Sequence, residues 1–219
     1  MPGIMAKKSQ LFVVSSILYS DYPALLILDC EKPVLAAKSA SSTRPTRSTM
    51  TAISNQTQFN RAELEACSTG SLFAASDARL PADKLLMMDR IIDIQAEGGL
   101  FNRGEVRAEL DINPELWFFK HHFVGDPLMP GSLMLEGLWQ TLGFYLGWSG
   151  HPGKVRALGV GDLRLKGEVK PDAGCIEYKV DIRRVVARQT VLAIAQGSIL
   201  QDGREIATAK DLRAGMFQG

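Results

Sequence analysis

Residues 120–140, KHHFVGDPLMPGSLMLEGLWQ, contain two of the three histidines of the chain. His121 and His122 are adjacent, so in an extended segment their side chains point to opposite faces, one toward a pocket and the other toward water. A neutral imidazole in such a pocket can remove a proton from carbon. The stretch therefore predicts a candidate general base. The alternative is a histidine that is simply packed in the core, which is the more common case for a single histidine near apolar residues.

Glu136 lies in a run of apolar residues that is predicted to form a helix from Gly131 to Gly147. A helix that is apolar nearly all round is buried on most of its sides. A carboxyl group enclosed by apolar atoms tends to hold its proton, and a protonated carboxyl can act as a general acid. The alternative is a first-turn glutamate that faces solvent and is favoured by the helix dipole.

The loop GDPLMPG, residues 125–131, leads into this helix, and its prolines fix the backbone just before Gly131. The N–H of Gly131 has no partner within the helix, so it can donate a hydrogen bond to a carbonyl oxygen on which negative charge develops. The alternative is an ordinary Pro–Gly entry into a helix. A base, such an N–H and an acid together could eliminate water from a 3-hydroxyacyl compound, and this chemistry requires neither a metal nor a redox cofactor.

The composition narrows the classes of function. The chain has 219 residues, 22% of them charged, with a net charge of +1, which gives no indication of nucleic-acid binding. The three cysteines (Cys30, Cys67 and Cys175) are widely spaced and form no CxxC pair, so neither a disulfide framework nor a zinc site is predicted. Reduced thiols in a cytoplasmic protein are the expected state.

Residues 1–49 differ in composition from the rest of the chain. Their apolar runs, LFVVSSILY and PALLIL, are shorter than the roughly 20 residues of a membrane helix, so no membrane span is predicted. The segment AAKSASSTRPTRST, residues 36–49, is rich in Ser and Thr and contains no acidic residue. We predict a disordered extension over 1–49 and one domain over 50–219. A targeting segment, or sequence translated ahead of a start at Met50, are the alternatives.

The elements that must hold the candidate residues follow from hydrophobic periodicity. Besides the long helix, the patterns predict a short helix over 60–70 and strands over 85–99, 103–112, 162–171, 175–186, 190–200 and 204–212. One long apolar helix followed by a series of strands is typical of an α+β protein in which the helix packs on an antiparallel sheet.

Five segments in this order resemble the bifunctional 3-hydroxydecanoyl-acyl-carrier-protein dehydratase/isomerase family (FabA-type). They are LLMMDRI, ELDINPELWFF, HFVGDPLMPGSL, RALGVGDLRLKGEV and DLRAGMFQG, and the likeness runs from about Phe59 to the C-terminus. The resemblance implies a hot-dog fold, in which an antiparallel sheet wraps a central helix, and a homodimer with active sites at the subunit interface. It implies that His122 is the catalytic histidine, Gly131 the N–H donor, and Glu136 a carboxylic acid supplied by the partner subunit.

The sequence departs from this family at two positions. Glu136 stands where the family has Asp, a pattern of related hot-dog dehydratases that only remove water and of dehydratase domains in polyunsaturated fatty acid and polyketide synthases. Ser132 stands where Cys is common. The expected reaction is dehydration of 3-hydroxyacyl-acyl carrier protein to trans-2-enoyl-acyl carrier protein in fatty acid biosynthesis. The alternatives are additional isomerisation to cis-3-decenoyl-acyl carrier protein, or dehydration in a specialised pathway.

Two further groups of residues are expected to contact the substrate. An apolar tunnel for the acyl chain is predicted from Phe118, Phe119, Ser132, Leu133, Trp139 and Phe144, with plain core packing as the alternative. Arg183, Arg184 and Arg188 are predicted to dock the acidic acyl carrier protein, with a solvated strand end as the alternative. A hot-dog binding module or a thioesterase would be the other classes of function, and a binding module would be expected to have lost the histidine or the carboxylate.

Overall fold

The computed structural model describes residues 56–73 and 76–218; the predicted extension over 1–49 and Cys30 lie outside this part. The helices are α2 (Arg61–Thr69), α3 (Gly131–Trp148) and two short 3-10 turns, Asp83–Leu85 and Trp117–Lys120. The strands are β1 (Arg90–Gln95), β2 (Glu105–Asp111), β3 (Lys154–Gly159), β4 (Asp162–Leu165), β5 (Cys175–Ala187), β6 (Val191–Gln201) and β7 (Arg204–Phe217). Within the described residues, no helix has the length and apolar character needed to cross a membrane.

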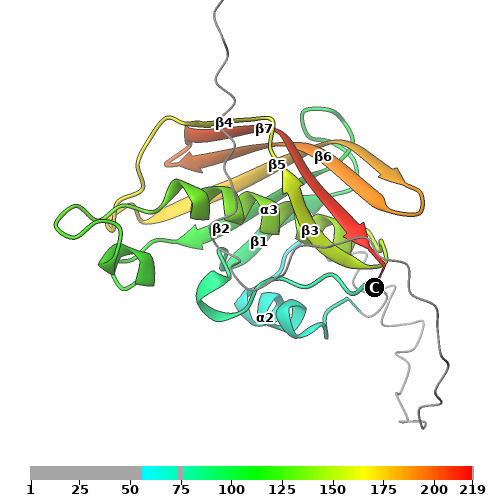
Figure 1. Cartoon of the computed structure of the whole chain (residues 1–219), viewed down its shortest axis with the longest axis horizontal. Coiled ribbons are helices and arrows are strands. Elements are labelled where there is room, and N and C mark those ends of the chain that lie inside the picture. Colours follow the sequence, from blue (N-terminus) through cyan, green and yellow to red (C-terminus); the bar gives the residue numbers. More distant parts are fainter. Residues whose placement is uncertain (1–55, 74–75, 219) are drawn as a thin grey trace, which may run out of the picture. The chain divides into compact units, whose positions relative to one another are not determined.

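All strand pairs are antiparallel and build one seven-stranded sheet in the order β1-β2-β5-β6-β7-β3. β7 is long enough to pair with β4 along Ala207–Lys210 and with β3 along Arg213–Phe217. α3 lies across one face of this sheet (Figure 1), and it packs against β2, β3, β5, β6 and β7. This arrangement is the predicted α+β hot-dog fold.

Burial explains the composition of α3. Thirteen of its 18 residues are buried, which fits a helix with the sheet on one side and the α2 region on another. Phe144 packs edge-to-face against Phe59 and Phe73, with ring centroids 4.9 and 5.1 Å apart. The buried hydroxyl of Thr141 donates to the carbonyl of Gly137 at 2.8 Å, which satisfies it within the helix. The apolar sequence of this helix therefore reflects enclosure within the fold.

Several predicted boundaries need correction. The strand predicted over 85–99 begins only at Arg90, and the one predicted over 162–171 ends at Leu165, where the N–H groups of Lys166 and Gly167 both turn to the carbonyl of Ile206. β3 was not predicted as a strand, because only two of its six residues are even partly buried and no period of two is visible. The remaining predicted elements are present, with ends shifted by a few residues.

The extended segment that was predicted for the two histidines is not present in the structure. Trp117–Lys120 form a 3-10 turn, and His121 follows as its C-cap with φ −121° and ψ −24°. The green connection from β2 to α3, which contains both histidines, reaches out beyond the sheet in Figure 1. The two side chains still differ in their surroundings, because His121 is exposed and His122 is half-buried.

Candidate active site

His122 is held by a loop that closes on itself. Its N–H donates to the carbonyl of Phe118 at 2.9 Å, and its carbonyl accepts from Leu128 at 2.7 Å. Phe123 and Asp126 exchange two backbone hydrogen bonds inside this loop, at 2.9 and 3.1 Å. The ring of Phe123 stacks on the imidazole with centroids 3.8 Å apart, and the peptide bond between these two residues is cis. Backbone hydrogen bonds of His122 and stacking by the Phe123 ring thus hold the imidazole in place.

The surroundings of the His122 ring define its tautomer. Nδ1 lies 3.0 Å from the carbonyl oxygen of Leu128. A carbonyl oxygen only accepts hydrogen bonds, so Nδ1 carries the hydrogen of the neutral ring and Nε2 keeps its lone pair. The loop therefore presents Nε2 as the basic nitrogen.

A pocket of about 560 Å³ adjoins this ring. It lies between the histidine loop, the start of α3 and the chain after β4, and its lining residues are His122, Leu128, Met129, Gly131, Met134, Leu165, Lys166, Gly167 and Glu168. Gly131 is the first residue of α3, so its N–H lies outside the hydrogen-bond ladder of the helix. A side chain on Gly131 would meet the side chain of Leu165. The predicted base and the predicted N–H donor thus line one pocket.

Glu136 is not among the residues that line this pocket. Its side chain is half-buried, and Oε1 accepts a hydrogen bond from Nε2 of Gln140 at 3.0 Å. The enclosure that the apolar sequence led us to expect is therefore only partial in one protomer. One chain places His122 and Gly131 in the same pocket, and the contribution of Glu136 from a partner subunit stays a prediction.

A model of the FabA-like domain family matches residues 80–210, more than half of the chain. The chain belongs to the FabA-like domain family. The resemblance to FabA-type hot-dog dehydratases that the sequence motifs predicted is thereby confirmed. Helix α2, with residues 61–69, lies outside the matched range.

Solved structures similar to this FabA-like chain share little sequence with it. The dehydratase heterocomplex ApeI:P from Xenorhabdus doucetiae is 15% identical with a TM-score of 0.48, over 65% of this chain and 90% of that chain. The dehydratase domain of RzxB from Pseudomonas fluorescens is 10% identical with a TM-score of 0.49, over 72% and 49%. A proposed thioesterase from Shewanella oneidensis is 14% identical with a TM-score of 0.45, over 72% and 96%.

The residues predicted to form the acyl tunnel of this FabA-like domain do not line the pocket beside His122. Four of them are buried in the core, namely Phe118, Phe119, Leu133 and Phe144. Ser132 is exposed and Trp139 is half-buried. Trp139 Nε1 is buried and has no hydrogen-bond partner among the described residues. Core packing accounts for the four buried side chains, and a role in the tunnel stays a prediction.

The three arginines predicted to dock a carrier protein are exposed at the end of β5 and just beyond it. Arg183 pairs with Asp211 at 2.9 Å, and its guanidinium lies 6.0 Å from the ring centroid of Phe101. The charge of Arg183 is thus partly balanced by a neighbour. A docking role for the group stays a prediction.

Sequence reasoning missed two groups that support the site. The carbonyl of Leu128 selects the tautomer of His122, and Gln140 contacts Glu136 from one turn farther along α3. The first depends on loop closure and had no signal in the sequence. The second did have one, because a glutamine four residues after a glutamate lies on the same face of a helix.

The described cysteines do not provide a nucleophile near neutral pH. Burial raises the pKa of the Cys67 thiol to about 11. Burial, and then the neighbouring carboxylates of Glu109 and Asp111, raise the pKa of Cys175 to about 11 as well. The described residues contain no cluster of His, Cys, Asp and Glu that could hold a metal ion. The imidazole of His122, the N–H of Gly131 and the carboxyl of Glu136 stay the predicted reactive groups of this FabA-like domain.

Proposed function

We propose that this FabA-like domain removes water from 3-hydroxyacyl-acyl carrier protein to give trans-2-enoyl-acyl carrier protein. Nε2 of His122 takes a proton from the carbon next to the thioester carbonyl. The N–H of Gly131 donates to the carbonyl oxygen while negative charge develops on it. Glu136 of a second copy then gives a proton to the hydroxyl on the next carbon. The C–O bond breaks, the C=C bond forms, and the hydroxyl leaves as water.

One observation carries this proposal above all others: His122, whose Nδ1 lies against a backbone carbonyl, and Gly131, the first residue of α3, line the same pocket. A base and an oxyanion donor in one cavity are the two groups that enolate formation requires. Membership of the FabA-like family supports the same reaction class. The acid is the third group, and Glu136 is the carboxyl that the resemblance assigns to it.

The length of Glu136 favours dehydration without isomerisation. A glutamate extends one methylene farther than an aspartate, and positional errors of about 1 Å matter greatly to catalysis. Moving a proton between two carbons to form a cis-3 alkene requires a more closely defined acid than releasing water does. The second candidate is therefore the bifunctional reaction on decenoyl-acyl carrier protein. A dehydration step in a polyunsaturated fatty acid or polyketide pathway would use the same site.

The partners in this proposal follow from the substrate and the site. The acyl chain arrives on an acidic carrier protein, for which Arg183, Arg184 and Arg188 offer positive charge at the end of β5. A homodimer would bring Glu136 of one copy to the pocket of the other. We place the reaction in cytoplasmic fatty acid biosynthesis.

Product analysis tests the proposed function. The full chain is incubated with 3-hydroxyacyl-acyl carrier proteins of several lengths, and with the matching coenzyme A thioesters in a parallel series. Chromatography with mass spectrometry identifies the alkene isomers. We expect the trans-2-enoyl product. A cis-3 product would establish the bifunctional alternative, whereas release of the free carrier thiol without an alkene would contradict dehydration and indicate a thioesterase.

A further inference from the structure

The amide of Gln140 is held in one orientation by the backbone of residues 85–87. Gln140 is only 4% exposed. Its Oε1 accepts from the N–H of Met87 at 2.8 Å, and its Nε2 donates to the carbonyl of Leu85 at 2.7 Å. Flipping the amide would place its NH₂ group against an N–H and its oxygen against a carbonyl. The orientation is therefore determined by the main chain.

This orientation has a consequence for Glu136. The remaining hydrogen of Gln140 Nε2 points to Oε1 of Glu136 at 3.0 Å. Because that oxygen receives a donated hydrogen bond, it acts as the acceptor of the carboxyl group, and a proton on the carboxyl resides on Oε2. The backbone of 85–87 thus favours Oε2 as the oxygen that carries a proton when Glu136 is protonated.

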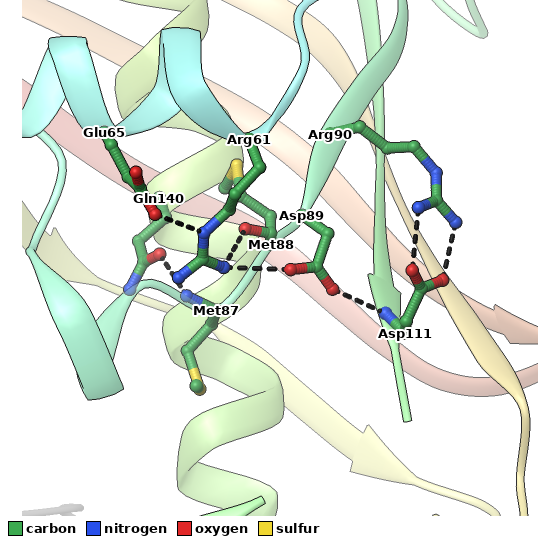
Figure 2. Close-up of polar contacts among 8 residues, drawn as sticks. All are labelled: Arg61, Glu65, Met87, Met88, Asp89, Arg90, Asp111 and Gln140. Atoms are coloured by element: carbon green, nitrogen blue, oxygen red, sulfur yellow. Dashed lines mark hydrogen bonds and ion pairs between the residues drawn. The ribbon is translucent and has the colours of Figure 1, made fainter. Parts of the chain in front are cut away.

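The backbone that follows is held in turn by helix α2. The guanidinium of Arg61 donates to the carbonyl of Met88 at 3.1 Å and pairs with Oδ1 of Asp89 at 2.9 Å. The other oxygen of Asp89 accepts from the N–H of Asp111 at 2.8 Å. Figure 2 shows Arg61 between Glu65 on its own helix and the Met88–Asp89 segment, and Asp89 reaching across toward the end of β2.

α2 is well suited to hold Arg61 in place. Asn60 and Glu63 form a capping box at its N-terminus, and Gly70 ends it in the left-handed conformation with φ 81°. Leu64 and Cys67 bury one side of the helix in the core. The helix is thus anchored independently of the ion pairs that Arg61 makes.

We propose that Arg61 is a positioning residue for the reaction. It fixes the segment Leu85–Asp89 and, through the N–H of Met87 and the amide of Gln140, sets the direction in which Glu136 presents its proton. This inference rests on the proposed function, because it takes Glu136 as the acid. Helix α2, which lies outside the range matched by the family, thereby contributes to the geometry of the acid.

Because the ion pair between Arg61 and Asp89 is partly exposed, its effect on catalysis can be distinguished from its effect on stability. The side chains of Arg61 and Asp89 are 38% and 27% exposed, and ion pairs at such positions contribute little to stability. Displacement of a catalytic group by about 1 Å, in contrast, can lower a rate by roughly 100-fold. Loss of Arg61 should therefore change turnover far more than it changes the thermal midpoint.

Steady-state kinetics of Arg61→Met provide the test, with Glu65→Gln as the matched control. The control removes the salt bridge between Arg61 and Glu65 and leaves both contacts with Met88 and Asp89 in place. With 3-hydroxydecanoyl-acyl carrier protein, we expect Arg61→Met to lower kcat by about 10-fold or more while KM changes less than about 2-fold. Glu65→Gln should retain the wild-type kcat.

A double-mutant cycle with Gln140→Met separates positioning from a general effect on the fold. If Arg61 acts through Gln140, adding Arg61→Met to Gln140→Met should lower kcat no further. An equal loss in both backgrounds would contradict the inference, because Arg61 would then act by another route.

Hydrogen exchange of the peptide that contains the Met87 amide gives a readout that does not depend on turnover or on the folding of Gln140→Met. Exchange at this amide should be faster in Arg61→Met and unchanged in Glu65→Gln. If the wild-type protein dehydrates its substrate but Arg61→Met matches it in kcat and in exchange, this inference alone is wrong. If the wild-type protein dehydrates no 3-hydroxyacyl substrate, the proposed function is wrong and this inference with it.

Discussion

His122 uses its two ring nitrogens for different purposes. Nδ1 is bound to the Leu128 carbonyl, which keeps the ring in place, and Nε2 is left as the proposed base in the pocket that Gly131 also lines. For the two nitrogens to have these different roles, a closed loop must lie on one side of the ring and a pocket on the other. The same residue therefore serves both the local structure and the proposed reaction.

Replacing His122 with Asn separates these two purposes. The amide of Asn can donate to the Leu128 carbonyl in place of Nδ1, but it offers no base at the position of Nε2. We expect His122→Asn to lower kcat by about 10²–10⁴-fold, the usual effect of losing a general base. The thermal midpoint should stay within about 2 °C of the wild type, as measured by circular dichroism. Turnover within about 10-fold of wild type would show that another group is the base.

The sequence allowed us to predict candidate reactive groups, but not most of the residues that hold these groups in place. His122 and Gly131 were selected because the motif HFVGDPLMPGSL resembles the FabA-type family, whose catalytic histidine directly precedes Phe, and both residues line one pocket. The contact of Gln140 with Glu136 was readable from helical spacing, but its bonds to Leu85 and Met87 were not, since they join segments more than 50 residues apart. Such contacts depend on the folded backbone and leave no local pattern.

At the level of elements, α3 approaches β5 closely at one glycine. A Cβ on Gly137 would lie only 2.6 Å from the hydroxyl oxygen of Tyr178 and would also meet its ring. Tyr178 is completely buried, and its hydroxyl has no hydrogen-bond partner among the described residues. Burial strongly raises the pKa of this phenol, so the hydroxyl stays neutral. The fold therefore requires the smallest residue at position 137.

Substituting Gly137 with Ala should destabilise the domain despite the better helix propensity of Ala. We expect a loss of about 1–3 kcal/mol in the free energy of unfolding, measured with urea, because the enclosed tyrosine ring cannot move aside. Gly143→Ala on the same helix is the matched control. Its Cβ would approach one methyl of the half-buried Val155 at 2.9 Å, which has room to shift. If Gly137→Ala is no less stable than this control, the close approach does not limit packing.

Elements with a clear period were predicted from the sequence, and those without one were not. β5 and β6 alternate buried and less buried positions over much of their length, and both were found with small errors at their ends. β3 is exposed along most of its length and was missed. The 3-10 turn Trp117–Lys120 gave no signal, because four residues are too few to establish a period. The prediction of an extended segment for the two histidines was wrong because this short turn was not recognised in the sequence.

At the level of the whole molecule, the fold was predicted from motifs spread along the chain, and the family match confirms the family to which it was assigned. The long central helix and the antiparallel sheet also followed from periodicity alone. A single protomer, however, accounts for only two of the three proposed reactive groups in its pocket. The proposal that Glu136 of a second copy completes the pocket concerns an assembly, and a local sequence pattern does not test it.

Heterodimers of two inactive variants test the central claim most directly. His122→Asn and Glu136→Gln are produced together with different affinity tags, and dimers that carry both tags are isolated. If Glu136 serves the pocket of the partner, one of the two sites in each heterodimer has both His122 and Glu136. We then predict about half of the wild-type kcat, although each parent homodimer is nearly inactive. A heterodimer as inactive as its parents would contradict a site shared between His122 of one copy and Glu136 of the other.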